Sequence, residues 1–185
     1  MAEQKFTPRA ENVLRLAQEA AGELGHGYVG CEHLLLGLLQ EDGGVAYRAL
    51  SDAGVTESAV RELIVRMEGR GLSGSAPSQG LTPRARSAVE LAVAEAMRFG
   101  SPYIGTEHLL LGLLRDGSNM ALHLVSAAGV PPKRLYSAVV QKINDMPRAA
   151  AKEGGRMKGD GEGRRSRGLA DFTRDLTELA RTGQL

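Results

Sequence analysis

A tandem repeat constrains the fold of this chain more than any other feature of its sequence. The phrase GCEHLLLGLL at residues 30–39 returns as GTEHLLLGLL at residues 105–114, and the flanking residues match at the same offset of 75. The matched pairs are Thr7/Thr82, Gly25/Gly100, Tyr28/Tyr103, Glu32/Glu107, Gly37/Gly112 and Gly54/Gly129. Because the offset is constant from about residue 6 to 66, the sequence indicates one structural unit duplicated in tandem.

The start of each repeat has the signals of a helix. A threonine suited to the N-cap, Thr7 or Thr82, precedes a proline, and apolar residues then recur at helical spacing until a glycine follows. A second helix is expected over the leucine-rich phrase, with Thr106 as its N-cap in repeat two. Repeat one has Cys31 at that position, which is a weaker cap.

Two further helices are expected in each repeat. The third covers about residues 45–53 in repeat one, with Gly54 as the C′ residue that ends it, and Gly129 takes that place in repeat two. The fourth runs from about Thr56 to Met67, and from Pro131 to Asp145 in the second copy. The predicted fold class is therefore all-α, with two pseudo-symmetric four-helix units.

The leucine-rich phrase predicts a helix buried in the core. Its glycines, Gly37 and Gly112, cost about 1 kcal/mol each relative to alanine, so we expect them to allow close helix packing. For His33 and His108 we expect partly buried imidazoles that satisfy local backbone groups. A carboxylate at Glu32 or Glu107 complements the helix dipole, which is worth only a few tenths of a kcal/mol when exposed.

Composition divides the chain into five segments. Residues 1–68 and 81–146 hold the repeats, and residues 69–80 form a Gly/Ser linker. Residues 147–168 carry seven basic and three acidic residues with few large apolar ones, which predicts a flexible basic linker. Residues 169–185 have the pattern of a short amphipathic helix with no partner left in this chain.

Several functional classes find no support in the sequence. The longest apolar run is far shorter than a membrane span of about 20 residues, and the start of the chain lacks the pattern of a secretory signal. No phosphate-loop motif and no HExxH occurs. The single cysteine, Cys31, fits a reducing compartment and lacks the spaced partners of a metal site. We therefore expect no catalytic residues, no metal and no cofactor in this chain.

These residues resemble a known family. FTPRA and LGHGYVGCEHLLLGLL, followed by LTPRA and YIGTEHLLLGLL, are similar to the double Clp repeat domain at the N-terminus of ClpC-type AAA+ unfoldases, over residues 5 to about 146. The closing segment LADFTRDLTELARTGQL resembles the start of the first ATPase module of those proteins. The resemblance implies that ATP belongs to a parent protein, that this domain is a monomeric recognition module, and that it works in the cytoplasm.

The resemblance also implies partners and site residues. Domains of this family receive adaptors of the MecA type and unfolded substrates for a ClpP-like peptidase, and some members dock arginine-phosphorylated proteins in two pockets. The implied phosphoarginine-binding residues are Glu32 with Thr7 and Glu107 with Thr82.

Two other functions remain open at this point. The domain could dock adaptors or unfolded apolar segments without phosphoarginine, in which case an apolar groove between the repeats matters and the two glutamates are dispensable. Nucleic-acid binding through the basic linker has thin support, because the segment has no aromatic residue to stack on bases. Its candidate residues are Arg156, Lys158, Arg164, Arg165 and Arg167.

Overall fold

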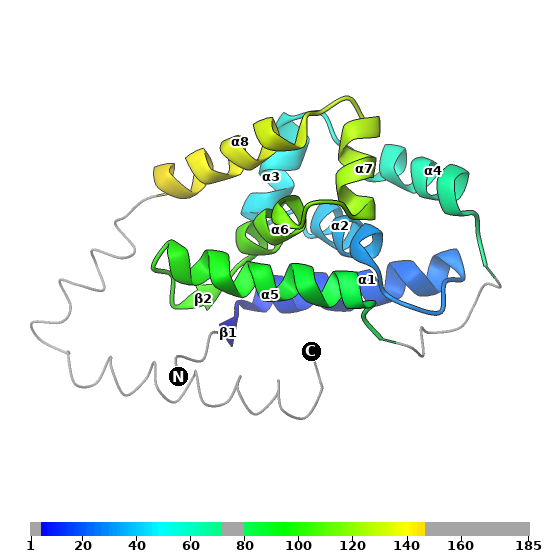
Figure 1. Ribbon diagram of the computed structural model, residues 1–185, viewed down its shortest axis with the longest axis horizontal. Coiled ribbons are helices and arrows are strands. Elements are labelled where there is room, and N and C mark those ends of the chain that lie inside the picture. The colour runs from blue at the N-terminus through cyan, green and yellow to red at the C-terminus, as the bar shows by residue number, and fades with distance from the viewer. Residues whose placement is uncertain (1–4, 72–79, 147–185) are drawn as a thin grey trace, which may run out of the picture.

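A computed structural model describes residues 5–71 and 80–146 (Figure 1). In repeat one the helices are α1 (Pro8–Leu24), α2 (Cys31–Gln40), α3 (Val45–Asp52) and α4 (Glu57–Glu68). In repeat two they are α5 (Pro83–Arg98), α6 (Thr106–Arg115), α7 (Met120–Ala127) and α8 (Pro132–Asp145). The prediction of four helices in each repeat is confirmed.

The first helix of each repeat begins where its sequence signals place it. The Thr7 hydroxyl accepts from the Ala10 N–H at 3.1 Å, and the Thr82 hydroxyl accepts from the Ala85 N–H at 3.0 Å. Proline follows each cap, where its missing N–H costs no hydrogen bond. Helix α1 ends at Gly25, whose φ of 76° is the left-handed conformation that glycine favours.

The predicted cap of the second helix is wrong. Gly105, not Thr106, is the N-cap of α6, and Thr106 is the first helical residue. The Thr106 hydroxyl instead accepts from the Ala46 N–H at 3.3 Å, in the first turn of α3 in the other repeat. Gly30 likewise takes the N-cap of α2, which begins at Cys31. Thr106 therefore stabilises a helix of repeat one rather than its own.

The two repeats share one core. Helix α1 packs on α2 and α5 on α6, but α3 contacts α6 and α8, and α4 contacts α7, so the last two helices of each repeat pack across the repeat boundary. In Figure 1, α1 and α5 run along the lower edge, α2 and α6 lie above them, and the remaining four helices form the upper layer. Buried apolar residues from both repeats make a single cluster.

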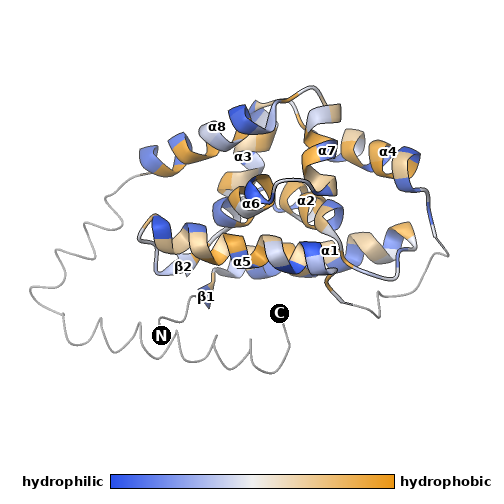
Figure 2. Cartoon of the chain, viewed as in Figure 1, coloured by the Kyte–Doolittle hydropathy of each residue, from blue (hydrophilic) through white to orange (hydrophobic). Residues whose placement is uncertain are grey.

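The leucine-rich helices lie in that core, as predicted. Their leucines are buried, and α2 is apolar over most of its surface while α1, α5 and α8 carry apolar and polar faces (Figure 2). A Cβ added at Gly37 would lie 2.5 Å from the Val13 carbonyl oxygen, and one at Gly112 would lie 2.3 Å from that of Ala88. Both glycines therefore allow the close helix packing that the sequence predicts.

Two short backbone pairings, which the helical pattern does not predict, join the start of each repeat to the other repeat. Strand β1 (Lys5–Phe6) pairs in parallel with β2 (Tyr103–Ile104), and the Thr7 N–H donates to the Ile104 carbonyl at 2.9 Å. Val29 bridges Leu81, and the Thr82 N–H donates to the Val29 carbonyl at 2.9 Å. Each N-cap threonine thus lies next to the second helix of the opposite repeat.

The proposed linkers and the C-terminal segment fall largely outside this description. Residues 72–79 and 147–185 are not among the described residues, so the predicted basic linker, its five candidate basic residues and the amphipathic segment at 169–185 stay predictions. None of the described helices combines the length and the apolar character needed to cross a bilayer.

Candidate functional site

Two pockets lie where helices of opposite repeats begin. The larger, here the Glu107 pocket, has a volume of about 750 Å³ and is lined by Thr7, Arg9, Glu41, Gly44, Thr106 and Glu107 among others. The second, here the Glu32 pocket, has a volume of about 420 Å³ and is lined by Tyr28, Cys31, Glu32, Glu68, Thr82 and Arg84 among others. The four implied site residues are thus distributed over two pockets.

The pairing of threonines and glutamates differs from the one that the resemblance implied. Glu32 shares its pocket with Thr82, and Glu107 shares its pocket with Thr7. The cause is the backbone pairing across repeats, which carries Thr7 to the segment before α6 and Thr82 to the segment before α2. Each pocket is consequently built from both repeats.

Helix N-termini surround both pockets. The first residues of α1, α3 and α6 line the Glu107 pocket, and residues at the starts of α5, α2 and α7 line the Glu32 pocket. The first N–H groups of a helix lack partners within it, and the helix dipole places positive potential there. Such an arrangement favours an anion, while the glutamates offer acceptors for a cation.

In the Glu107 pocket a second carboxylate is already paired with a cation. Arg9 donates from Nη1 to Glu41 Oε2 at 3.2 Å, and the Asn12 amide donates to the other oxygen of Glu41. The Glu41 side chain is 11% exposed and that of Glu107 is 14% exposed. Glu107 is therefore the carboxylate of this pocket that has no such ion pair with an arginine among the described residues.

Two carboxyl groups, those of Glu32 and Glu68, line the Glu32 pocket. The carboxyl group of Glu32 lies within hydrogen-bonding reach of Glu68. The Tyr28 hydroxyl donates to Glu68 Oε1 at 3.2 Å. Burial is the main cause that raises the pKa of Glu32 to about 8; a backbone hydrogen bond lowers it in part, and the charge and proximity of Glu68 raise it further. Burial, followed by the charges of Glu68 and Glu32, raises the pKa of Tyr28 to about 12.

The histidine of each leucine-rich phrase is fully buried and bonds to local backbone. The Gly30 N–H donates to His33 Nδ1 at 2.9 Å, and the Gly105 N–H donates to His108 Nδ1 at 2.9 Å. The predicted backbone role is confirmed, although the burial is complete rather than partial. Burial lowers the pKa of His33 to about 3 and lowers that of His108 as well.

Repeat one extends this contact into a chain of hydrogen bonds. Since His33 Nδ1 accepts from Gly30, its Nε2 carries the proton and donates to His26 Nδ1 at 2.8 Å. His26 Nε2–H in turn donates to the Gly69 carbonyl at 2.9 Å, directly after α4. The chain links the start of α2 to the end of α4.

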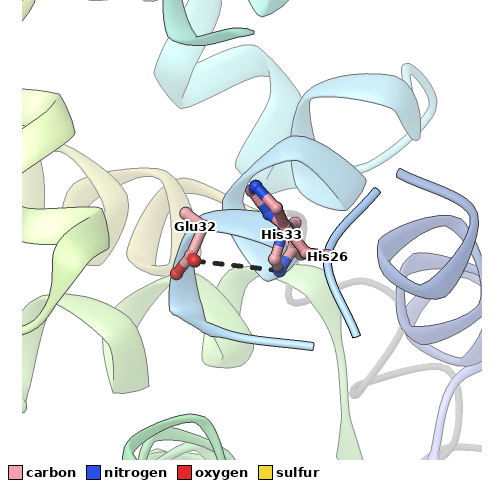
Figure 3. A group of neighbouring side chains, drawn as sticks. All are labelled: His26, Glu32 and His33. Atoms are coloured by element: carbon pink, nitrogen blue, oxygen red, sulfur yellow. Dashed lines mark hydrogen bonds and ion pairs between the residues drawn. The ribbon is translucent and has the colours of Figure 1, made fainter. Parts of the chain in front are cut away.

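The cluster of His26, Glu32 and His33 does not fit a metal ion, although one potential ligand atom from each lies within 4.8 Å of the others (Figure 3). Every ring nitrogen of the two histidines is already engaged in a hydrogen bond. Glu32 approaches His33 at Nδ1, 3.9 Å away, whereas His26 bonds to Nε2 on the opposite side of that ring. The three ligand atoms therefore do not converge on one point.

Cys31 lies at the start of α2 with 2% of its surface exposed. Burial, together with the charge of Glu32, raises the pKa of its thiol to about 12. A thiol that stays protonated is a poor nucleophile and a poor metal ligand. Cys31 therefore acts as a small buried residue at the start of α2.

Sequence reasoning missed the neighbours of the two glutamates. Tyr28 carried a signal, because it belongs to the repeat and matches Tyr103. Glu68 carried none, because the position 75 residues later is Ile143. His26 likewise matches Ser101. Residues present in only one repeat could not be found by comparing the repeats.

Comparisons with known proteins identify the family of this chain. The model of the Clp repeat (R) N-terminal domain family matches residues 5–116 and 80–158. Chloroplastic chaperone protein ClpC1 of Oryza sativa subsp. japonica is 36% identical over 182 residues, and chaperone protein ClpB of Oceanobacillus iheyensis is 37% identical over 183. Both alignments cover 98% of this chain, which spans about a fifth of the length of these relatives.

Solved structures share the fold. The N-terminal domain of ClpD from Arabidopsis thaliana has a TM-score of 0.64 at 25% identity, covering 75% of this chain and 97% of that one. A ClpV N-domain solved with a VipB peptide has a TM-score of 0.54 at 19% identity, covering 71% and 82%. The helical architecture, the duplicated phrase and the family match lead to one assignment: the chain belongs to the Clp repeat N-terminal domain family found in ClpC- and ClpB-type chaperones.

Proposed function

We propose that this domain recognises substrates and adaptors for an ATP-dependent Clp unfoldase, and that its two pockets dock proteins bearing phosphorylated arginine. Unfolding, ATP hydrolysis and delivery to a ClpP-like peptidase would belong to the longer parent protein, in the cytoplasm. Adaptors of the MecA type and arginine-phosphorylated or unfolded proteins are the proposed partners, and the isolated domain is proposed to be a monomer.

The observation that carries this proposal is the meeting of a carboxylate with helix N-termini in each pocket. Phosphoarginine presents a guanidinium next to a phosphoryl group. A carboxylate suits the first, and backbone N–H groups at helix starts suit the second. The N-cap hydroxyls of Thr7 and Thr82 accept from backbone and keep a proton to donate.

Each pocket also has a cation at its edge. Arg9 and Arg84 follow the first-turn prolines of α1 and α5 and line the two pockets, with side chains 59% and 57% exposed. Arg9 pairs with Glu41 and Arg84 lies near Asp116, and the exposed N–H groups of each guanidinium can in addition donate to a bound phosphoryl group. Both halves of phosphoarginine therefore have a partner of opposite charge in each pocket.

Calorimetric titration with free phosphoarginine tests the proposal, with arginine and phosphoserine as controls. We expect about two sites per chain in the wild type, about one in Glu32→Ala and in Glu107→Ala, and none in the double variant. Circular dichroism verifies that each variant is folded. A folded wild-type protein that gives no heat, or a double variant that still binds, would contradict the proposal.

A groove between the repeats favours adaptor or unfolded-segment docking as a second function. It lies between α3 and α8, has a volume of about 580 Å³, and includes Ala49, Ala53, Val130, Leu135 and Ala138 in its lining. The ClpV N-domain of shared fold was solved with a peptide. If this groove is the docking site, Ala138→Asp should abolish binding of an apolar model peptide while Glu32→Ala/Glu107→Ala leaves it unchanged.

A further inference from the structure

We infer that Glu68 is a binding residue of the Glu32 pocket, where it and Glu32 form a two-carboxylate receptor for the guanidinium of the docked ligand and release a proton on binding. This rests on the proposed function, since the guanidinium is that of phosphoarginine. The inference makes the two pockets chemically different.

The two carboxyl groups meet because of where their helices begin and end. Glu32 is the second residue of α2, and Glu68 is the last residue of α4. Both line the same cavity of about 420 Å³, together with Thr82 at the start of α5. In phosphoarginine the N–P bond replaces one of the five N–H donors of the guanidinium, and the remaining donors can still bond to two carboxylates at once.

The histidine chain of repeat one holds Glu68 in place. His26 donates to the carbonyl of Gly69, the residue after Glu68, and Gly69 has a φ of 78°. The Tyr28 ring stacks on His26 with centroids 5.6 Å apart, and its hydroxyl donates to Glu68. The backbone and the side chain at the end of α4 are thus both fixed from the segment before α2.

Among the described residues, no cationic side chain forms an ion pair with Glu32 or with Glu68. The flanking groups are His33 and Cys31 on α2, Tyr28 and His26 before it, Glu68 on α4, Arg84 on α5 and Asp116 after α6. His33 is neutral, and Arg84 lies 3.8 Å from the Asp116 carboxylate. Burial and Glu68 hold the pKa of Glu32 at about 8.

A ligand with a guanidinium changes the protonation of Glu32. A pKa of about 8 keeps a proton on Glu32 near pH 7, and an opposite charge within about 4–6 Å favours the ionised form. Entry of the guanidinium therefore releases the proton of Glu32 to solvent. Glu32 and Glu68 then each accept a charge-assisted hydrogen bond from the guanidinium.

The Glu107 pocket lacks the residues that form the two-carboxylate receptor. Its second carboxylate, Glu41, already accepts from Arg9 and Asn12. Ile143 stands at the position equivalent to Glu68, and Ser101 at the position equivalent to His26. The Glu107 pocket is therefore the internal control for proton release.

Calorimetry with free phosphoarginine in two buffers of different ionisation enthalpy measures the protons released. Glu107→Ala isolates the Glu32 pocket, and Glu32→Ala isolates the other. Near pH 7 we expect the first variant to release up to one proton per ligand more than the second, because ionisation of the phosphoryl group is common to both. Its affinity should fall between pH 8 and pH 6 by up to about tenfold per pH unit relative to the other pocket.

Adding Glu68→Gln to Glu107→Ala should remove the extra proton release and weaken binding about tenfold. Equal proton release in both single variants, or unchanged binding in Glu107→Ala/Glu68→Gln, overturns the inference and leaves the proposed function standing. Absence of heat in the folded wild type overturns the proposed function and the inference with it.

A carboxyl carbon NMR titration of the unliganded protein tests the carboxyl pair separately from ligand binding. Glu32 should titrate well above its ordinary range in the wild type and closer to it in Glu68→Gln. Titration of Glu32 in the ordinary range in the wild type would refute the proton held on Glu32, whatever the calorimetry shows.

Discussion

Repeat one and repeat two connect equivalent helices through different polar networks. In repeat two, Glu95 of α5 is fully buried and accepts from Arg115 of α6 at 2.6 Å and from the Tyr136 hydroxyl of α8 at 2.8 Å. The matching positions in repeat one are Ala20, Gln40 and Arg61. There Gln40 and Arg61 donate to Glu57 of α4, whose side chain is 39% exposed.

The pockets differ in the same way. Both have a threonine, a glutamate and helix N-termini at equivalent positions, but the second carboxylate is Glu41 from an interhelical loop in one and Glu68 from the end of α4 in the other. The apolar faces and the close-packed glycines are common to both repeats. Duplication therefore preserved the packing that fixes the helices, while the polar partners changed separately in each copy.

The comparison of the polar networks predicts the largest effect on stability. Glu95→Ala removes hydrogen bonds from Arg115 and Tyr136 at a fully buried site, and we expect it to lower the free energy of unfolding by about 3 kcal/mol. Glu57→Ala, the matched change in the partly exposed network, should cost less than about 1 kcal/mol. Urea denaturation measures both. Equal losses of unfolding free energy would show that the burial of Glu95 does not make its network more stabilising than that of Glu57.

The glycines of the leucine-rich helices test what the repeats have in common. Gly112→Ala places a Cβ against the backbone of Ala88 and Ala92, and Gly37→Ala places one against Val13 and Ala17. Each should destabilise the fold by about 1–3 kcal/mol, the larger loss at Gly112 with its shorter contacts. Gly27→Ala, with nothing within 4 Å of its Cβ, is the control. A neutral Gly112→Ala, measured by the same denaturation, would refute the close packing.

The smallest expected effect is a pH dependence specific to repeat one. Because the pKa of Glu32 is raised from 4.5 to about 8 in the fold, its contribution to stability is full below pH 4.5 and is lost as the pH rises toward 8. The depressed pKa of His33, about 3 against 6.5, contributes stability that is full above pH 6.5 and is lost on acidification. Between pH 6.5 and 8 the Glu32 effect therefore acts without that of His33.

Stability should accordingly fall by on the order of 1 kcal/mol as the pH rises from 6.5 to 8 in the wild type. Denaturation of Glu32→Gln at the same pH values should show this fall removed, whereas Glu107→Gln, the matched change in repeat two, should retain it. A wild-type slope that persists in Glu32→Gln would assign the pH dependence to other groups.

Local signals in the sequence predicted most of the helices but not how the repeats interlock. N-cap threonines, prolines and terminal glycines act within a few residues, so Thr7, Thr82 and Gly25 could be interpreted from the sequence alone. Thr106 could not, because its hydroxyl bonds to Ala46, 60 residues away. A constant offset shows that two units are alike and gives no information on whether they exchange helices.

The residues that share a pocket were also hard to predict, because local sequence signals do not show contacts between distant segments. Glu32 and Glu107 were identified because the repeated phrase contains them, whereas their pairing with threonines depended on the two-residue strands β1 and β2 and on the single bridge between Val29 and Leu81. Strands that short leave no periodic pattern in a sequence. Glu68 was missed because it depends on contacts between α2 and α4, at a position that the second repeat does not share.

The crossing of the two repeats has a consequence for the origin of this domain. A pocket that takes its threonine from one repeat and its glutamate from the other cannot exist in a single repeat. Two separate copies of one repeat, related by a twofold axis, would form the same pocket twice, and every mutation would then alter both. Fusion into one gene removes that constraint, so one pocket can have a residue such as Glu68 while the other has none at the equivalent position.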